Sequence, residues 1–141
     1  MIIMNSQEEK CIMIIDEMLP LGLIANTAAI LGITIGEKMP EIVGGDITDK
    51  NGNRHLGIIE FPVTVLRGTA ERIKELRQKL SNEEELLVVD FSDLAQSCKT
   101  YDEFREKMAD ASEDSLQYLG LAVCGPKKKI NRFTGSMPLL R

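Results

Sequence analysis

Two pairs of carboxylates directly follow apolar runs typical of buried strands, and they are the side chains of this chain best placed for chemistry. Asp16 and Glu17 end the first such run, and Asp90 and Asp93 follow a later one. In open α/β sheets, ligands bind beyond the carboxyl ends of the strands, where a carboxylate could orient a water molecule. An aspartate that ends a strand is also a common turn or cap residue. Both interpretations are kept for Asp16 and Asp90.

Two polar side chains, Asn26 and Thr27, interrupt the apolar stretch 19–35. Buried polar groups need hydrogen-bond partners. The Thr27 hydroxyl can donate to a preceding carbonyl of the same helix. Otherwise the two side chains line a pocket at the start of the helix. The turn before them lacks the glycine spacing of either nucleotide-binding fingerprint.

The cysteines and the single histidine predict no metal site and no cofactor. The chain has no CxxC pair, and His55 alone cannot complete a Cys/His zinc set. Three cysteines are too few and too scattered for a disulfide framework. We expect Cys11 and Cys124, which stand in apolar runs, to be small buried hydrophobic side chains, and Cys98 to be exposed.

The charge balance disfavours extensive nucleic-acid binding. Seventeen basic side chains stand against twenty-two acidic ones, a net charge of −5, which repels polyphosphates. The only basic patch is formed by Lys127 to Lys129 with Arg132. A solvated helix face is our first interpretation of this patch, and contact with a phosphate or RNA is the second.

The elements that must position these residues alternate between strands and helices. A length of 141 residues is typical of one domain. The patterns predict strands over residues 10–15, 41–48, 54–60, 61–66, 86–89 and 116–124, and helices over residues 22–36, 70–80, 92–97, 100–108 and 127–134. Residues 49–53 carry a hairpin signal. We expect one α/β domain over residues 1–141, with a mixed, mostly parallel sheet and helices on both faces.

The helix predicted over residues 22–36 is apolar nearly all round. Such a helix must be covered on both sides, by the sheet and by something else, so we expect a homodimer. The apolar stretch approaches transmembrane length, but Pro20, Gly22 and Asn26 interrupt it, and a core helix is the better interpretation. The N-terminus lacks the features of a secretory signal. We therefore expect a cytoplasmic protein that does not enter a membrane.

The C-terminal third resembles a known signature. The run from Gly120 to Pro126, followed by Ile130, by Thr134-Gly135 and by Leu139-Leu140, is similar to the end of peptidyl-tRNA hydrolase II. Within that superfamily the chain most resembles the uncharacterised bacterial group called domain of unknown function 2000. The resemblance implies a peptidyl-tRNA hydrolase II-like fold.

The resemblance also extends to the candidate site residues. Residues 16–27 are similar to the first loop and helix start of that family, and Gly22 falls on a matching small residue. Asp90 lies near the position of the family's aspartate. Together with the strand ends, this implies a small-ligand site formed by Asp16, Gly22, Asn26, Thr27 and Gly125.

Departures from the family bear on activity. The enzymes carry lysines in the first loop, where this chain has Leu21 and Leu23. A lysine can hold a tRNA phosphate or stabilise a developing oxyanion, and leucine can do neither. Residues 93–115 also look inserted and are acidic. We therefore expect a non-catalytic or small-ligand-binding member. The alternative is a hydrolase of an ester or amide, such as a peptidyl-tRNA-like substrate, that uses Asp90 with Asn26 or Thr27.

Overall fold

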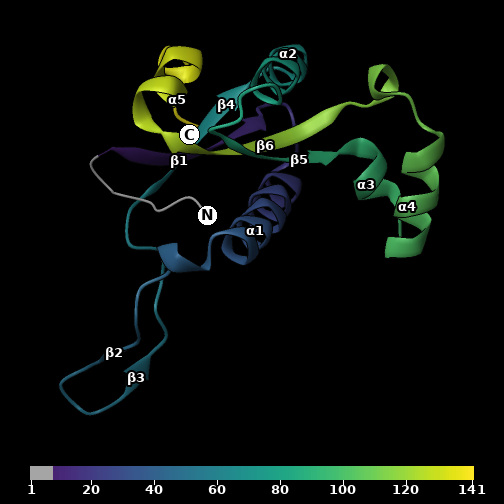
Figure 1. Cartoon of the computed structure of the whole chain (residues 1–141). Coiled ribbons are helices and arrows are strands. Elements are labelled where there is room, and N and C mark those ends of the chain that lie inside the picture. Colours follow the sequence, from purple (N-terminus) through teal and green to yellow (C-terminus); the bar gives the residue numbers. More distant parts are fainter. Residues whose placement is uncertain (1–7) are drawn as a thin grey trace.

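The computed structural model describes residues 8–141, in which a four-stranded sheet carries helices on both faces (Figure 1). The sheet strands are β1 (Glu9–Asp16), β4 (Val63–Gly68), β5 (Leu87–Ser92) and β6 (Tyr118–Pro126), and a separate hairpin is formed by β2 (Ile47–Thr48) and β3 (Arg54–His55). The helices are α1 (Leu21–Lys38), α2 (Ala70–Leu80), α3 (Asp93–Ser97), α4 (Tyr101–Asp110) and α5 (Lys127–Thr134), with short 3-10 helices η1 (Pro40–Ile42) and η2 (Glu113–Ser115).

The sheet is mixed, and our expectation of a mostly parallel sheet is wrong. The strand order is β4-β1-β6-β5, and only β1 and β4 run parallel. Strand β6 runs antiparallel to both of its neighbours. Continuous apolar runs suggested parallel strands, but the same pattern arises wherever helices cover both faces of a sheet, whichever way its strands run.

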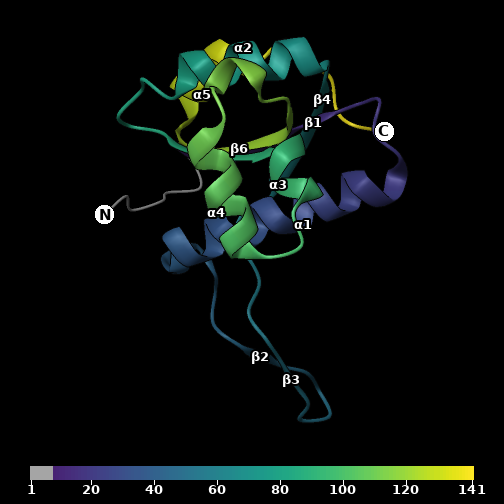
Figure 2. The ribbon, with the colours of Figure 1, turned by 90° about the vertical axis from the view of Figure 1, so that its right-hand side faces the viewer.

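Side chains of the sheet alternate between two apolar layers, one on each face. Figure 2 shows α2 and α5 on one face of the sheet and α1 on the other. One layer packs Ile12, Ile14, Leu121 and Val123 of the sheet against α2 and α5. The other packs Met13 and Ala122 with the buried side of α1. The prediction of helices on both faces is confirmed.

Hydrogen bonds define the starts of two helices and the position of the C-terminal tail. The Thr69 hydroxyl accepts from the Arg72 amide at the start of α2. The Thr100 hydroxyl accepts from the Glu103 amide at the start of α4. The C-terminal tail returns to the free edge of β4, where the Leu140 amide donates to the Val65 carbonyl over 3.0 Å.

The strand expected over residues 41–48 is largely absent. Pro40 opens η1 instead, and only Ile47 and Thr48 are extended in a ladder. The hairpin turn is confirmed: the Asp49 carboxylate accepts from the Asn51 and Asn53 amides at 2.9 and 3.0 Å. We call residues 43–59 the arm, because this hairpin projects from the body beneath α1 (Figures 1 and 2).

Cys11 and Cys124 are fully buried, as expected, but they are joined in a disulfide. The expectation that they are separate hydrophobic side chains is wrong. They are 113 residues apart in the chain and lie directly opposite each other in the β1–β6 ladder. Only the register of the sheet brings them together.

No helix within residues 8–141 combines the length and the apolarity needed to cross a bilayer.

Candidate functional site

Asp90 lies on the edge strand β5 and faces α2. Its Oδ2 accepts from Nε of Arg77 over 3.4 Å, and both side chains are about 30% exposed. The same guanidinium lies 5.5 Å from the centroid of the Tyr118 ring. The amphipathic pattern of α2 places Arg77 toward water, and that expectation is wrong, because the side chain turns back onto β5. Asp90 is thus held by a cation that sequence reasoning did not assign to it.

Thr27 and Asn26 lie on α1, and their side chains have different surroundings. The Thr27 side chain is fully buried, and its hydroxyl donates to the Leu23 carbonyl over 2.7 Å. This confirms the intrahelical alternative for Thr27. Its methyl group packs on the Cα of Gly120, where an added Cβ would lie only 2.7 Å from Thr27 Cγ2. Asn26 is exposed on the outer side of the helix.

The sheet separates these two groups. Thr27 packs against β6 from the α1 side, whereas Asp90 meets Arg77 on the α2 side. A four-stranded sheet filled by apolar side chains on both faces lies between them (Figure 1). The Asp90–Arg77 pair and the Thr27 hydroxyl therefore lie on opposite faces of the sheet, although Asp90 also borders a cleft beside α1.

Of the remaining sequence-predicted site residues, Asp16 ends β1, Gly22 lies in the first turn of α1, and Gly125 lies near the end of β6. Asp16 is 4% exposed, and its Oδ1 accepts from the Met18 amide over 3.0 Å, as in the turn interpretation. Gly22 lies exposed in the first turn of α1. Gly125 pairs with Lys10 near the start of β1, at the opposite end of that strand from Asp16. The antiparallel direction of β6 causes the separation of Gly125 from Asp16, because the carboxyl ends of β1 and β6 lie at opposite ends of the sheet.

A cleft of about 480 Å³ opens between the side of α1, the edge strand β5 and the segment 95–104, and we call it the α1–α4 cleft. Its walls are mainly apolar and aromatic, and they include a few polar groups. The lining residues are Ile30, Thr34, Val89, Asp90, Phe91, Ala95, Cys98, Lys99, Thr100, Tyr101 and Phe104. The Tyr101 and Phe104 rings meet edge to face at 5.5 Å. The acidic segment 93–115 thus supplies one wall of this cleft.

Sequence reasoning missed the α1–α4 cleft. Cys98, expected to be exposed, is partly buried in it, and its thiol donates to the Leu94 carbonyl over 3.2 Å. A signal was present, because Tyr101 and Phe104 are two of only six aromatic residues in the chain and stand together on a charged helix. Aromatic side chains on such a helix indicate a surface that packs or binds.

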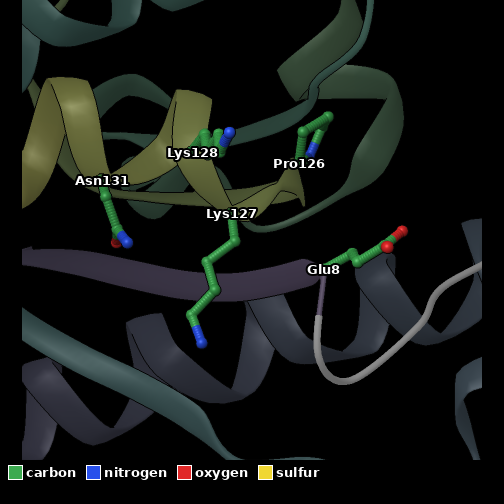
Figure 3. Close-up of a pocket in the computed structure, with 5 residues that line it drawn as sticks. All are labelled: Glu8, Pro126, Lys127, Lys128 and Asn131. Carbon is green, nitrogen blue, oxygen red and sulfur yellow. The ribbon is translucent and has the colours of Figure 1, made fainter.

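A second hollow, of about 490 Å³, lies at the start of the basic helix α5 (Figure 3). Glu8, Pro126, Lys127, Lys128 and Asn131 line it. The Lys127 amide donates to the Glu8 carbonyl over 2.8 Å, and in Figure 3 the Lys127 side chain extends across β1 while the Glu8 carboxylate points away from it.

Acidic partners offset part of the basic patch. Lys129 Nζ lies 2.7 Å from the Glu83 carboxylate and 3.5 Å from that of Glu85. The hydrogen bond to Glu83 raises the pKa of Lys129. Lys10 is also engaged, since it donates to the Asn131 side chain over 2.8 Å.

Within the part of the chain that the structure describes, no three His, Cys, Asp or Glu side chains gather in a way that could hold a metal ion.

Comparisons with known proteins identify the family and the fold. A family model described as "Protein of unknown function (DUF2000)" matches residues 9–141. Among solved structures, the fold is similar to that of a protein of unknown function, Atu0240, from Agrobacterium tumefaciens strain C58, with a TM-score of 0.85. That alignment has 19% identity and covers 94% of this chain and 97% of the other. A search of curated proteins finds no match.

Proposed function

We propose that this chain, which belongs to the DUF2000 family, is a non-catalytic protein that binds a small, largely apolar ligand in the α1–α4 cleft. The proposal keeps the peptidyl-tRNA hydrolase II-like relationship inferred from the sequence. The observation that carries it is the α1–α4 cleft itself, a mainly apolar hollow of about 480 Å³.

The character of the cleft supports a binding role. Small-molecule sites are concave, mostly apolar and between about 300 and 1,000 Å³, with a few polar groups that orient the ligand. The α1–α4 cleft has this size, and Ile30, Phe91 and Phe104 supply apolar wall. Lys99 and Thr100 at its rim could meet one polar or anionic end of the ligand.

The surroundings of Asp90 support the absence of hydrolysis. A general base must reach the proton that it removes and must be free to accept it. The Asp90 carboxylate is paired with Arg77, and the positions where the related enzymes carry lysines hold Leu21 and Leu23. The hydrolase alternative therefore has less support than binding.

The test uses 1-anilinonaphthalene-8-sulfonate, a fluorescent aromatic anion, as the probe. We expect saturable binding to the native protein with one site in the cleft. Phe104→Ala should weaken this binding about tenfold, because it removes an aromatic wall worth roughly 1–2 kcal/mol. Phe133→Ala is the matched control: this phenylalanine is also half-buried on a helix, but it lies on α5, on the other face of the sheet.

Two results would overturn the proposal. The binding part fails if Phe104→Ala binds the probe as tightly as the wild type does. The non-catalytic part fails if the protein hydrolyses peptidyl-tRNA or a simple ester and Asp90→Ala abolishes that turnover.

A further inference from the structure

We propose that a second copy of this chain packs against the outer face of α1, and that the arm of each copy lies along the flank of the other. Large apolar side chains concentrate on these two surfaces. They are Met18, Leu21 and Ile33 at α1, with exposed fractions of 82, 82 and 75%, and Ile47, Leu56 and Ile58 on the arm, with 68, 72 and 78%. This inference is independent of the proposed ligand cleft.

The outer face of α1 is unusual because it carries no charge before the last turn of the helix, where Glu37 and Lys38 lie. Residues 18–36 contain no Asp, Glu, Lys or Arg, although charged residues make up 28% of the chain. Ala25, Asn26 and Ala29 are exposed between Leu21 and Ile33. Two copies that each carry a net charge of −5 repel one another. An uncharged face is the surface across which they can approach most closely.

The arm is also incomplete on its own. Strands β2 and β3 pair only with each other, through Ile47 with His55 and Thr48 with Arg54. At its base, the arm is attached by the Val43–Ile59 bridge and by the bond from the Gly44 amide to the Ile58 carbonyl. An isolated two-stranded hairpin is at best marginally stable in water. We therefore expect the arm to gain stability by packing on another surface.

The geometry favours a second copy over an unrelated partner. The arm and α1 lie on the same side of the sheet in both views (Figures 1 and 2). Each side of the arm contains about eight residues, which would span up to about 25 Å in extended backbone. A helix layer is only about 10–12 Å thick. An arm of this length therefore passes the partner's α1 and reaches the partner's sheet, so one two-fold contact covers both surfaces of both copies.

The exposed area is sufficient for a stable dimer. The transfer energies of large aliphatic side chains correspond to about 100 Å² each. The six named side chains then expose roughly 450 Å² per copy at the exposures above. Apolar atoms contribute about 60% of an interface. Twice the apolar area of one copy therefore corresponds to a total buried area on the order of 1,500 Å² for the dimer. Stable protein interfaces bury about 1,200–2,000 Å².

Sedimentation velocity at micromolar concentration is the first test. We expect the wild type to sediment with twice the 15.7 kDa mass of the chain. Ile33→Asp and Ile58→Asp should each yield a folded monomer, because each places a charge in one half of the interface. Tyr101→Asp is the control: Tyr101 is 69% exposed but lies on α4, so this variant should remain dimeric. A monomeric wild type, or a dimer that survives both α1 and arm variants, overturns the proposal.

Cysteine cross-linking tests the position of the symmetry axis. In a two-fold contact, residues near the axis meet their own counterparts. In a Cys98→Ser background, we expect Ala29→Cys, in the middle of α1, to form an intermolecular disulfide under mild oxidation. Ala109→Cys, at an exposed alanine of α4, is the matched control and should stay monomeric in denaturing gels. Equal cross-linking of the two variants contradicts α1 as the contact.

Discussion

The close approach of α1 to β6 at Gly120 makes a quantitative prediction about Thr27. A Cβ added to Gly120 would lie 2.7 Å from Thr27 Cγ2, and 3.3 Å from both the Ile14 carbonyl oxygen and Leu31 Cδ1. Thr27 cannot easily rotate away, because its hydroxyl is bonded to the Leu23 carbonyl and β-branched side chains are stiff at χ1. The helix itself must move. We expect Gly120→Ala to lower the free energy of unfolding by about 1–3 kcal/mol.

The partner substitution Thr27→Ser makes the test specific. It keeps the hydroxyl that donates to Leu23 and removes only the methyl group that faces Gly120. Alone it should cost about 0.5–1.5 kcal/mol, as for removal of one buried methyl. In the double variant, the alanine methyl group occupies the space that the threonine methyl group vacates. The double variant should therefore be more stable than additivity predicts, by at least about 1 kcal/mol.

Urea denaturation of the wild type and the three variants measures this cycle, provided that the m-value stays constant. Gly22→Ala is the control, because nothing lies within 4 Å of a Cβ built there, at the start of α1. It should leave stability unchanged or raise it by up to about 1 kcal/mol. The packing argument is wrong if Gly120→Ala is as stable as the wild type, or if the effects of the two substitutions on the free energy of unfolding are additive. Thr27 would then again be a candidate functional residue.

Two further predictions concern the core. Reducing the Cys11–Cys124 disulfide should lower the free energy of unfolding by about 3–5 kcal/mol, because its 113-residue separation closes a long loop in the unfolded chain. Alkylation of the denatured, unreduced protein should modify Cys98 alone, and modification of all three cysteines would contradict the pairing. Burial raises the pKa of Tyr118 from 10.0 to about 12, so the folded state keeps a proton that the unfolded chain loses. The resulting stabilisation is complete below pH 10 and is lost as the pH rises toward 12. The free energy of unfolding of the wild type, measured relative to that of Tyr118→Phe, should therefore fall over that interval. A constant difference would refute the assignment.

The amino-acid sequence by itself determined the elements and most of their ends. Apolar runs located β1 and β5, and the spacing of Ile73, Leu76 and Leu80 located the buried side of α2. Thr69 and Thr100 marked the helix starts through hydrogen bonds that reach only three residues along the chain. Such signals are local, so a single sequence contains them.

Only the tertiary structure decided strand direction, pairing and the composition of any site. An apolar run indicates that a strand is buried on both faces, but it does not indicate the direction of the neighbouring strand. The sequence therefore predicted a mostly parallel sheet, whereas β6 runs antiparallel to both of its neighbours. Because β6 is antiparallel to β1, Gly125 lies at the far end of the sheet from Asp16, and Cys11 lies opposite Cys124. The contact between Arg77 and Asp90 and the walls of the α1–α4 cleft likewise join segments through packing rather than through sequence spacing. Functional residues come together through such long-range contacts. The free energy of these contacts depends on the whole fold, and no periodic pattern in the sequence indicates them.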